Sequence, residues 1–185
     1  MRTLALIEIV VCWIAWAYPP LFLAPHGQKR ASITAARPSR IGLLLELLGF
    51  AAALVFHLPA FQPPPIWRLI AAMIPGPFAA VLMWSAVRHL GRQFRIQAGL
   101  YEDHRLVRSG AYAVVRHPIY ASMLMLLAAT LLLLTSWLGM AAALALFLTG
   151  TEVRVRTEDA LLASRFPAAF AAYRSRVPAY LPFVR

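Results

Sequence analysis

The chain has 185 residues, of which 61% are apolar and only 14% are charged, and its mean hydropathy is +0.68. Soluble domains contain ~45–50% apolar and ~25% charged residues, so the composition argues against a soluble globular enzyme and against a disordered chain. The single cysteine, Cys12, excludes a disulfide framework and a cysteine-based zinc site. The net charge of +11 would suggest nucleic-acid binding in a soluble protein, but in a membrane protein it reports topology.

Five apolar segments have about the length of the ~20-residue helices that cross the ~30 Å hydrocarbon core of a membrane. They cover residues 4–24, 41–58, 69–87, 119–135 and 137–153. The last two come from one uncharged run, which as a single helix would be about 50 Å long and which Thr135, Ser136 and Gly139 interrupt. We therefore predict an all-α integral membrane protein. Its five transmembrane helices form a single membrane domain, 1–185, in which the fourth and fifth spans make a tight helical hairpin.

The basic residues are distributed unequally between the two predicted sides of the membrane. Sixteen of the 18 Lys and Arg residues lie in 25–40, 88–118 and 154–185, and only Arg2 and Arg68 lie on the other side. Since Lys and Arg are retained in the cytoplasm, the N-terminus is predicted outside and the C-terminus inside. A cleaved signal peptide is the alternative for the first segment, but cleavage would place the basic 25–40 loop outside.

The two long cytoplasmic segments, 88–118 and 154–185, are the predicted location of a catalytic site, because the outside loops are short. The sequence contains no GxG, HExxH or GxSxG motif, and its five histidines lack metal-ligand spacing. No metal site is therefore expected. No internal repeat is evident, which weakens the hypothesis of a transporter built from inverted halves.

Pro118 is predicted to begin the fourth span, since proline suits the first position of a helix and biases the preceding residue toward extended backbone. The N-terminus of a helix carries partial positive charge and free N–H groups. With Arg116 beside it, this helix start would bind a carboxylate or a phosphate. The alternative is an interfacial arginine that contacts lipid phosphate.

The tail contains apolar residues at helical spacing, which predicts one apolar helix face, split where Pro167 begins a second helix. These residues are Leu162, Phe166, Phe170, Tyr173 and Val177. Such a helix either caps a site or is an amphipathic anchor on the membrane surface. We expect the tail and the cytoplasmic loop, which we predict to be helical, to form a pocket together.

Arg154 and Glu158 are four residues apart and share a helix face. They are either a solvated ion pair, worth only ~0.3–0.5 kcal/mol, or residues that hold a cationic cofactor and an anionic substrate.

Glu46 and His57 are ionisable residues within the second span and hence candidates for function. Both lie near its ends, and Glu46 could instead meet a basic group at the inner boundary.

Two parts of the sequence together resemble the isoprenylcysteine carboxyl methyltransferase family. The first is 104–120, HRLVRSGAYAVVRHPIY, and the second is Arg154, Glu158 and Asp159 followed by the closing 176–183, RVPAYLPF. The resemblance covers about 88–185. The RHPxY element alone also occurs in related membrane methyltransferases and, loosely, in sterol reductases. Asp159, Pro167 and Phe170 depart from the residues usual in the family.

Members of that family are multi-span enzymes that transfer the methyl group of S-adenosylmethionine to a carboxylate on a lipid-bearing substrate. The resemblance implies a cofactor pocket lined by Gln97, His104, Arg105, Leu106, Val107, Tyr112, His117, Pro118, Ile119, Tyr120 and Glu158. It implies that Arg154 binds the substrate, which makes Arg154 and Glu158 the candidate catalytic pair. Either Tyr112 or Tyr120 would face the sulfonium. The short chain is similar to prokaryotic members, which implies the cytoplasmic membrane of a prokaryote.

The sequence therefore predicts a membrane methyltransferase that uses S-adenosylmethionine and methylates an isoprenylcysteine-like or other lipophilic carboxylate, with no nucleic-acid partner. A carboxylate is ionised at pH 7 and needs no general base. A lipid amine or thiol is the alternative acceptor, and for an amine His104, His117 or Glu158 would have to act as base. A reductase that uses NADPH and a non-catalytic transporter or accessory protein are the remaining hypotheses. The sequence leaves the acceptor and the oligomeric state open.

Overall fold

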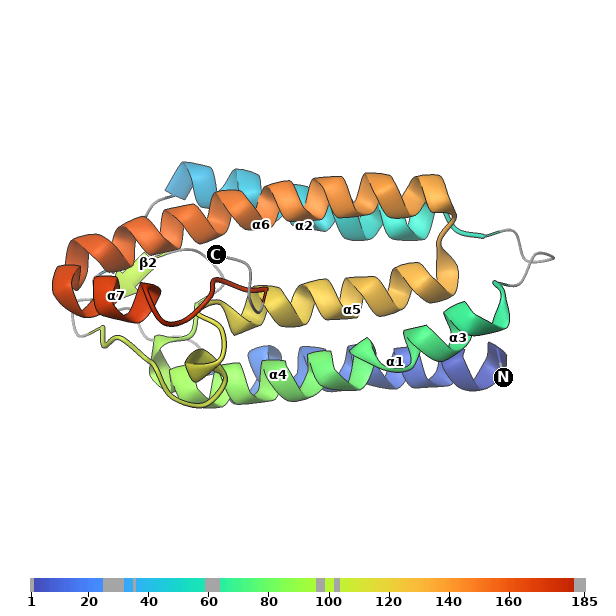
Figure 1. The fold of residues 1–185 in the computed structure, drawn as a ribbon, viewed down its shortest axis with the longest axis horizontal. Coiled ribbons are helices and arrows are strands. Elements are labelled where there is room, and N and C mark those ends of the chain that lie inside the picture. The colour runs from blue at the N-terminus through green and yellow to red at the C-terminus, as the bar shows by residue number, and fades with distance from the viewer. Residues whose placement is uncertain are drawn as a thin grey trace.

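The computed structural model describes residues 2–24, 32–34, 36–58, 64–95, 99–101 and 104–181. In this part of the chain the protein is a bundle of long helices, with one small ladder of two strands at one end (Figure 1). The helices are α1 Arg2–Tyr18, α2 Ala36–Val55, α3 Ile66–Ala72, α4 Pro75–Leu90, α5 Pro118–Leu134, α6 Trp137–Arg165 and α7 Pro167–Arg174. Shorter turns follow α1, follow α4 and precede α5, namely η1 Pro19–Leu23, η2 Gly91–Gln93 and η3 Gly110–Ala113.

Four helical stretches of the described chain are long and apolar enough to cross a membrane. They are Arg2–Leu23, Arg37–Val55, Ile66–Gln93 and Trp137–Arg165, and α5, with 17 residues, is a shorter apolar helix. Large apolar side chains such as Leu4, Ile14 and Val81 lie on the outer surface, where a soluble protein would place polar residues. The chain is therefore a multi-pass integral membrane protein.

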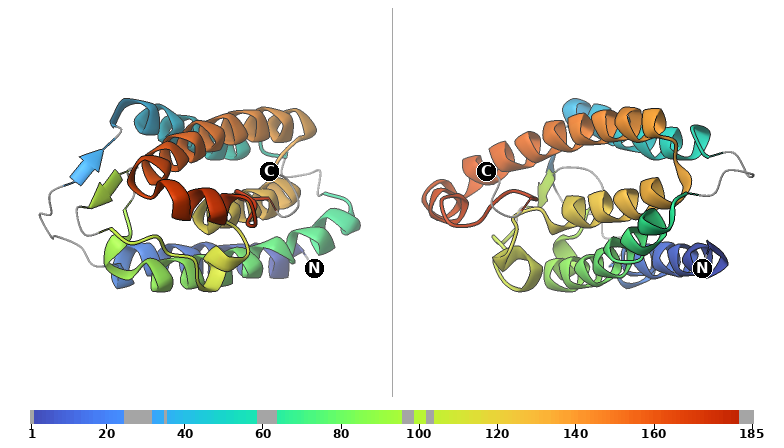
Figure 2. Two further views of the ribbon diagram at one scale, coloured as in Figure 1. Left: turned by 60° about the vertical axis from the view of Figure 1, so that its left-hand side comes forward. Right: turned by 45° about the vertical axis from the view of Figure 1, so that its right-hand side comes forward.

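The helices form two layers with α5 between them (Figures 1 and 2). On one side α2 and α6 pack along each other, and on the other side α1, α3 and α4 pack together and against α5. The predicted hairpin between the fourth and fifth spans is present as a connection, since only Thr135 and Ser136 separate α5 from α6. Its two helices nevertheless make most of their contacts with other partners, α5 with α4 and α6 with α2.

Glycines permit the close approach of α2 and α6. A Cβ atom at Gly150 would lie 2.5 Å from the carbonyl oxygen of Gly42, and a Cβ at Gly49 would lie 2.9 Å from that of Ala143. Small residues at such crossings let the backbones of membrane helices touch. The crossing brings Glu46, which is fully buried on α2, directly against α6.

The third predicted span, 69–87, lies within the candidate span Ile66–Gln93, but a break divides it into two helices. α3 ends at Ala72 and α4 begins at Pro75, because a proline lacks the N–H donor and its ring clashes with the carbonyl four residues before it. The fifth span was predicted to end at 153, yet α6 continues without a break to Arg165. The helix face that Arg154 and Glu158 were expected to share and the break expected at Pro167 are both present, so the span and its polar extension form one continuous helix.

The loop predicted as helical, 88–118, is only partly so. Its strand β2, Gly99–Tyr101, pairs antiparallel with β1, Ser32–Thr34, so that Ile33 lies opposite Leu100. Three-residue strands carry too little alternation of polar and apolar residues to be recognised in a sequence. The ladder joins the loop before α2 to the loop after α4 (Figure 2).

A buried arginine stabilises the opposite end of the bundle. Arg68, on α3, is only 2% exposed, and its guanidinium donates hydrogen bonds to the carbonyl oxygens of Leu131, Leu132 and Thr135 at distances of 2.7 to 2.9 Å. These carbonyls lie at the end of α5, where the helix carries partial negative charge. The carbonyl of Leu131 also accepts from the backbone N–H of Thr135 at 3.1 Å. Arg68 therefore caps α5 and connects it to α3.

Candidate active site

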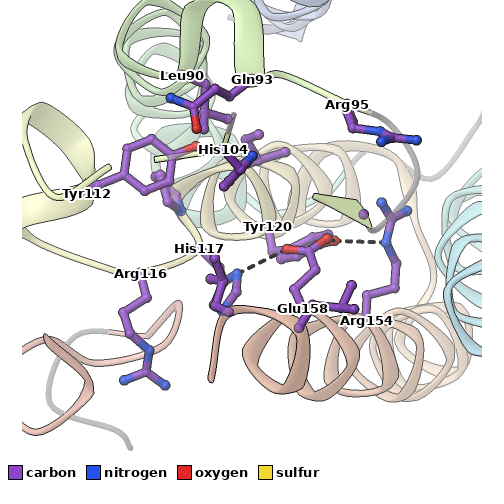
Figure 3. A pocket seen from close by; sticks show the side chains of 15 residues that line it. Leu90, Gln93, Arg95, His104, Tyr112, Arg116, His117, Tyr120, Arg154 and Glu158 are labelled. Carbon is purple, nitrogen blue, oxygen red and sulfur yellow. Dashed lines mark hydrogen bonds and ion pairs between the residues drawn. The ribbon is translucent and has the colours of Figure 1, made fainter. Parts of the chain in front are cut away.

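A cavity of about 130 Å³ lies at the end of the bundle where α4 ends and α5 begins, beside the second half of α6 (Figure 3). The N-terminus of α1 lies at the other end of the bundle (Figure 1). Eight of the residues predicted for the site line the cavity: His104, Tyr112, His117, Pro118, Ile119, Tyr120, Arg154 and Glu158. The structure thus brings together two segments that are far apart in the sequence.

Three other predicted residues do not line the cavity. Arg105 is exposed and its backbone N–H donates to the side chain of Gln93 at 2.9 Å. Leu106 and Val107 follow it and are half-buried away from the cavity lining. Gln97 lies outside the described residues.

Several lining residues were missed by the sequence analysis. They are Leu90, Gln93, Arg95, Gly99 and Leu161, whereas Leu162 was expected on the apolar face of the tail helix. Leu161 and Leu162 lie one turn after Glu158 on α6, so the helical spacing from Glu158 was a usable signal for them. The others lie around the end of α4 and on β2, where no motif marked them.

A continuous network of hydrogen bonds and ion pairs lies along one side of the cavity. The charged residues that it joins alternate between acidic and basic. In order it contains Glu46, Arg154, Tyr120, Glu158, His117, Asp159 and Arg116. The sequence analysis separated these residues into independent candidates. Their connection follows only from the fold, which places α2, α5 and α6 around one point.

Arg154 is the first centre of this network. It is 5% exposed, its Nη1 lies 3.0 Å from Oε2 of Glu46, and its Nε donates to the hydroxyl of Tyr120 at 2.9 Å. The hydroxyl of Thr151 donates to the other oxygen of Glu46 at 3.2 Å. Glu46 thus meets a basic group, as one of its two interpretations expected, and that group is the candidate substrate-binding arginine.

Glu158 and His117 form the second centre. The hydroxyl of Tyr120 donates to Oε1 of Glu158 at 2.5 Å, and Nδ1 of His117 lies 3.3 Å from Oε2 of Glu158. The other ring nitrogen, Nε2, lies 2.8 Å from Oδ1 of Asp159. Figure 3 shows Tyr120 between Arg154 and Glu158, with His117 on the far side of Glu158.

His117 therefore faces one carboxylate at each ring nitrogen. A neutral imidazole has a single N–H donor, whereas the imidazolium has two, so this geometry favours the protonated ring. Burial opposes the charge, but the hydrogen bonds with Asp159 and Glu158 and their negative charges outweigh it and raise the pKa of His117. A protonated and doubly paired His117 is a cation that fixes Glu158 and cannot accept a proton.

Arg116 lines the cavity, but its charge is used elsewhere. Its guanidinium lies 3.1 Å from Asp159 and donates to the carbonyl oxygen of Val177 at 2.5 Å. The backbone N–H groups of Arg116 and His117 donate to Pro178 and Ala179, each at 2.8 Å. Arg116 is therefore paired with Asp159 and with the tail after α7, which returns to this point, and the anion site expected at the start of α5 stays a prediction.

The short helix α7 holds Tyr112 in place. Phe170 and Tyr173 are buried, as the apolar face predicted, and α7 begins at Pro167 as expected. The hydroxyl of Tyr173 donates to the carbonyl oxygen of Tyr112 at 2.5 Å. Burial raises the pKa of Tyr173 to about 12, and burial together with the charge of Glu158 raises the pKa of Tyr112 well above its usual value. Both phenols are therefore neutral at physiological pH.

The lining suits a ligand that is partly cationic and partly aromatic. It combines the carboxylate of Glu158 with the rings of Tyr112 and Tyr120 and with apolar side chains such as Ile119 and Leu161. Tyrosine faces attract cations within about 6 Å of the ring. The cavity volume of about 130 Å³ is below the ~300–1,000 Å³ typical of ligand pockets. A nucleoside-sized cofactor would therefore extend beyond it, and the residues present otherwise fit S-adenosylmethionine.

Comparison with known proteins identifies the family. Residues 71–164, about half of the chain, match the model of the isoprenylcysteine carboxyl methyltransferase (ICMT) family. The chain belongs to the ICMT family. The resemblance noted in the sequence is thereby confirmed, and the matched range contains α4, α5 and most of α6, including Arg154 and Glu158.

Three curated relatives cover different shares of the chain. Protein-S-isoprenylcysteine O-methyltransferase B of Arabidopsis thaliana is 27% identical over 169 residues, which is 89% of this chain and 85% of the relative. The cobalt-zinc-cadmium resistance protein CzcN of Cupriavidus metallidurans is 38% identical over 163 residues, 85% of this chain and 70% of the relative. Protein-S-isoprenylcysteine O-methyltransferase of Schizosaccharomyces pombe is 30% identical over 102 residues, 54% of this chain and 43% of the relative.

Proposed function

We propose that this ICMT-family membrane protein is a methyltransferase that uses S-adenosylmethionine and methylates the carboxylate of a lipophilic acceptor, such as an isoprenylcysteine. The observation that carries the proposal is the placement of Arg154 and Glu158 side by side on the wall of one cavity, with Tyr120 between them. Arg154 offers a positive charge for an anionic acceptor, and Glu158 offers a negative charge for a cationic cofactor. Only the side chain of Tyr120 separates them.

The cofactor side of the cavity is assigned to Glu158, Tyr112, Tyr120, His104 and the start of α5. When bound, S-adenosylmethionine supplies an electrophilic methyl group on a sulfonium. Glu158 offers negative charge in a fixed position, because His117 and Tyr120 hold both of its oxygens. The tyrosine rings add electron-rich surface that favours a cation.

The acceptor side is assigned to Arg154, whose guanidinium can hold a carboxylate in a defined orientation. With the cofactor bound, transfer would exchange a bond from sulfur to methyl for a bond from oxygen to methyl, so the residues that line the cavity would not have to move a proton. No residue has to act as a base, which agrees with a His117 that is already protonated. Since opposite charges cancel during the transfer, exclusion of water and close positioning favour it.

For the membrane arrangement we propose five crossings in a single domain, with the N-terminus outside and the cavity and C-terminus in the cytoplasm. Support comes from the distribution of the basic residues. Further support comes from the position of the cavity, which lies at the end of the bundle opposite the N-terminus (Figure 1). The segments 88–118 and 154–185 would then contribute the cytoplasmic part of the site.

Binding of S-adenosylhomocysteine, measured by calorimetry on the detergent-purified protein, tests the proposal. We expect wild type and Arg154→Ala to bind and Glu158→Ala to lose binding. Glu152→Ala is the matched control, since Glu152 lies on the same helix but pairs with the exposed Arg156. Absence of binding by folded wild type contradicts a methyltransferase, and binding of NADPH instead would support the reductase hypothesis.

The acceptor is tested by transfer of labelled methyl groups to farnesylated cysteine derivatives. The expected product is a base-labile methyl ester, formed by wild type and strongly reduced in Arg154→Ala. A label that resists base would indicate an amine or thiol acceptor instead. Methylation of an amine would need a base, and among the histidines that line the cavity His117 is already occupied by two carboxylates.

A further inference from the structure

The ion pair between Glu46 and Arg154 is a contact that the proposed reaction does not use, and it joins Arg154, which lines the cavity, to Glu46, which does not. Glu46 comes from α2, outside the segments that carry the family motif, and its side chain is completely buried. Each carboxylate oxygen has a partner: Oε2 lies 3.0 Å from Nη1 of Arg154, and Oε1 accepts from the hydroxyl of Thr151. Glu46 is therefore the counter-ion of the buried Arg154 when no acceptor is bound.

A buried arginine without a counter-ion is costly, because its charge loses hydration and gains nothing in return. Glu46 supplies that counter-ion before any acceptor binds. The side chain of Arg154 is 6% exposed and that of Glu46 is 0% exposed, so the attraction between them is little screened by water or salt. Further partners of Arg154 include the hydroxyl of Tyr120 and, through it, Glu158.

An acceptor carboxylate at Arg154 would therefore enter a site that already holds an anion. Two carboxylates close together in a poorly solvated site cannot both remain ionised at low cost. The acceptor therefore binds only as Glu46 gives up its charge by taking a proton, and this cost weakens the binding of the acceptor. A neutral acceptor or a neutral ester would meet no such competition.

We propose that Glu46 is a specificity-determining residue of this protein, an internal carboxylate that competes with the acceptor carboxylate for Arg154 and recovers Arg154 once the acceptor has become an ester. This inference rests on the proposed function. Glu46 touches neither the acceptor nor the cofactor in this account and acts through Arg154 alone. It lowers the affinity for anionic ligands and favours release of the ester, which cannot pair with Arg154.

The proposal is tested by direct binding rather than by turnover. The ligands are N-acetyl-S-farnesylcysteine, which carries a carboxylate, and its carboxamide, which has the same shape without the charge. They are titrated into the detergent-purified full chain saturated with S-adenosylhomocysteine. Glu46→Gln is compared with wild type and with Glu8→Gln, a matched control on α1, where Glu8 contacts Cys12 and does not line the cavity.

In Glu46→Gln we expect the carboxylate to bind about tenfold more tightly than in wild type, since close charge pairs couple strongly when desolvated. The carboxamide should bind equally to both proteins, and Glu8→Gln should match wild type. A purely structural Glu46 would change both ligands alike or neither. Equal carboxylate affinity in wild type and Glu46→Gln, or weaker binding by Glu46→Gln, would overturn the proposal.

A second measurement uses wild type alone and remains decisive if Glu46→Gln does not fold. Calorimetry in two buffers of different ionisation enthalpy reports the protons taken up on binding. We expect about one proton for the carboxylate ligand, because a displaced buried carboxylate neutralises, and none for the carboxamide. Equal uptake for both ligands would overturn the proposal. Failure of S-adenosylhomocysteine to bind wild type would instead count against the proposed function.

Discussion

The side chain of Tyr120 connects the two candidate binding residues, Arg154 and Glu158, by hydrogen bonds. Its hydroxyl accepts a hydrogen bond from Arg154 and donates one to Glu158, so a single phenol orients the acceptor side and the cofactor side. Tyr120 is 3% exposed, and nothing else among the described side chains occupies this bridging position. The RHPxY element therefore contributes a bridge as well as a helix start.

Tyr120→Phe removes the bridge and keeps the ring. Buried hydrogen bonds to charged groups contribute about 1.5–3 kcal/mol, so we expect the affinity for S-adenosylhomocysteine to fall ~10-fold or more. Calorimetry on the purified variant measures this change. Tyr18→Phe is the control, since Tyr18 is an exposed ring on α1 that stacks on Trp84. Unchanged binding in Tyr120→Phe would mean that Glu158 does not depend on the bridge.

The stability of the folded protein should depend on pH through His117, and the direction of that dependence follows from its pKa. Folding raises its pKa above the ordinary value of 6.5, so the protonated ring stabilises the folded state. That contribution is complete below pH 6.5 and is lost as pH rises through the raised pKa. We expect Tm in detergent to decline over this upper window in wild type.

The matching variant is His117→Asn, which cannot titrate. Its Tm should be lower at pH 6.5 and should decline less as the pH rises, whereas His57→Asn, at the opposite end of the bundle, should follow wild type. An identical pH profile for wild type and His117→Asn would show that the two carboxylates do not hold a protonated ring.

Part of this candidate site could be predicted from local sequence motifs. His117, Tyr120, Arg154 and Glu158 were all placed in it from their motif, and they line one cavity. The partner of Arg154 was not predicted, because Glu46 lies 108 residues away and its pairing depends on how closely two helices cross. Charges brought together by tertiary packing leave no signal in local spacing.

At the scale of elements, α5 is stabilised at both ends by different means. At its start, the tail after α7 covers the preceding N–H groups, and Pro118 needs no partner. At its end, the guanidinium of Arg68 donates to three carbonyl groups. In the sequence, Arg68 was one of only two basic residues on the predicted outer side of the membrane. The structure explains its position, because Arg68 is buried and binds the end of α5.

Arg68→Met should destabilise the protein without altering the cavity. The substitution leaves three carbonyl groups without their charged donor, and we expect a loss of about 3 kcal/mol in the free energy of unfolding. Denaturant titration in detergent measures it, with Arg88→Met, an exposed position on α4, as control. Binding of S-adenosylhomocysteine by the folded variant should equal that of wild type. A weaker ligand affinity would mean that the cap also positions the start of α5.

Element boundaries differed from prediction where one residue overrode the apolar pattern. Hydropathy alone made 69–87 one span, yet Pro75 divides it into α3 and α4. The break was visible in the sequence and was outweighed by the apolar run. The pairing of β1 with β2 was not visible, since its strands are short and far apart in the chain.

For the whole molecule, the two-layer arrangement explains why the cavity lies at one end. α2 and α6 approach each other closely because of their glycines, and the second half of α6 extends beyond α2 toward α7 (Figure 1). The cavity occupies the space between this extension and the start of α5. In the proposed membrane arrangement, a polar cofactor would reach a site so placed from water and a lipid acceptor would reach it from the membrane.

The proposed orientation predicts which end of the bundle is accessible from outside the cell. Cys12 is the sole cysteine and is buried, so single cysteines placed on a Cys12→Ala background report on one site each. His57→Cys, at the exposed end of α2, should react with a membrane-impermeant maleimide in intact cells. Ser175→Cys, exposed after α7 beside the cavity end, should react only after permeabilisation. The reverse pattern would place the cavity outside, where S-adenosylmethionine is not made, and would contradict both the topology and the cofactor.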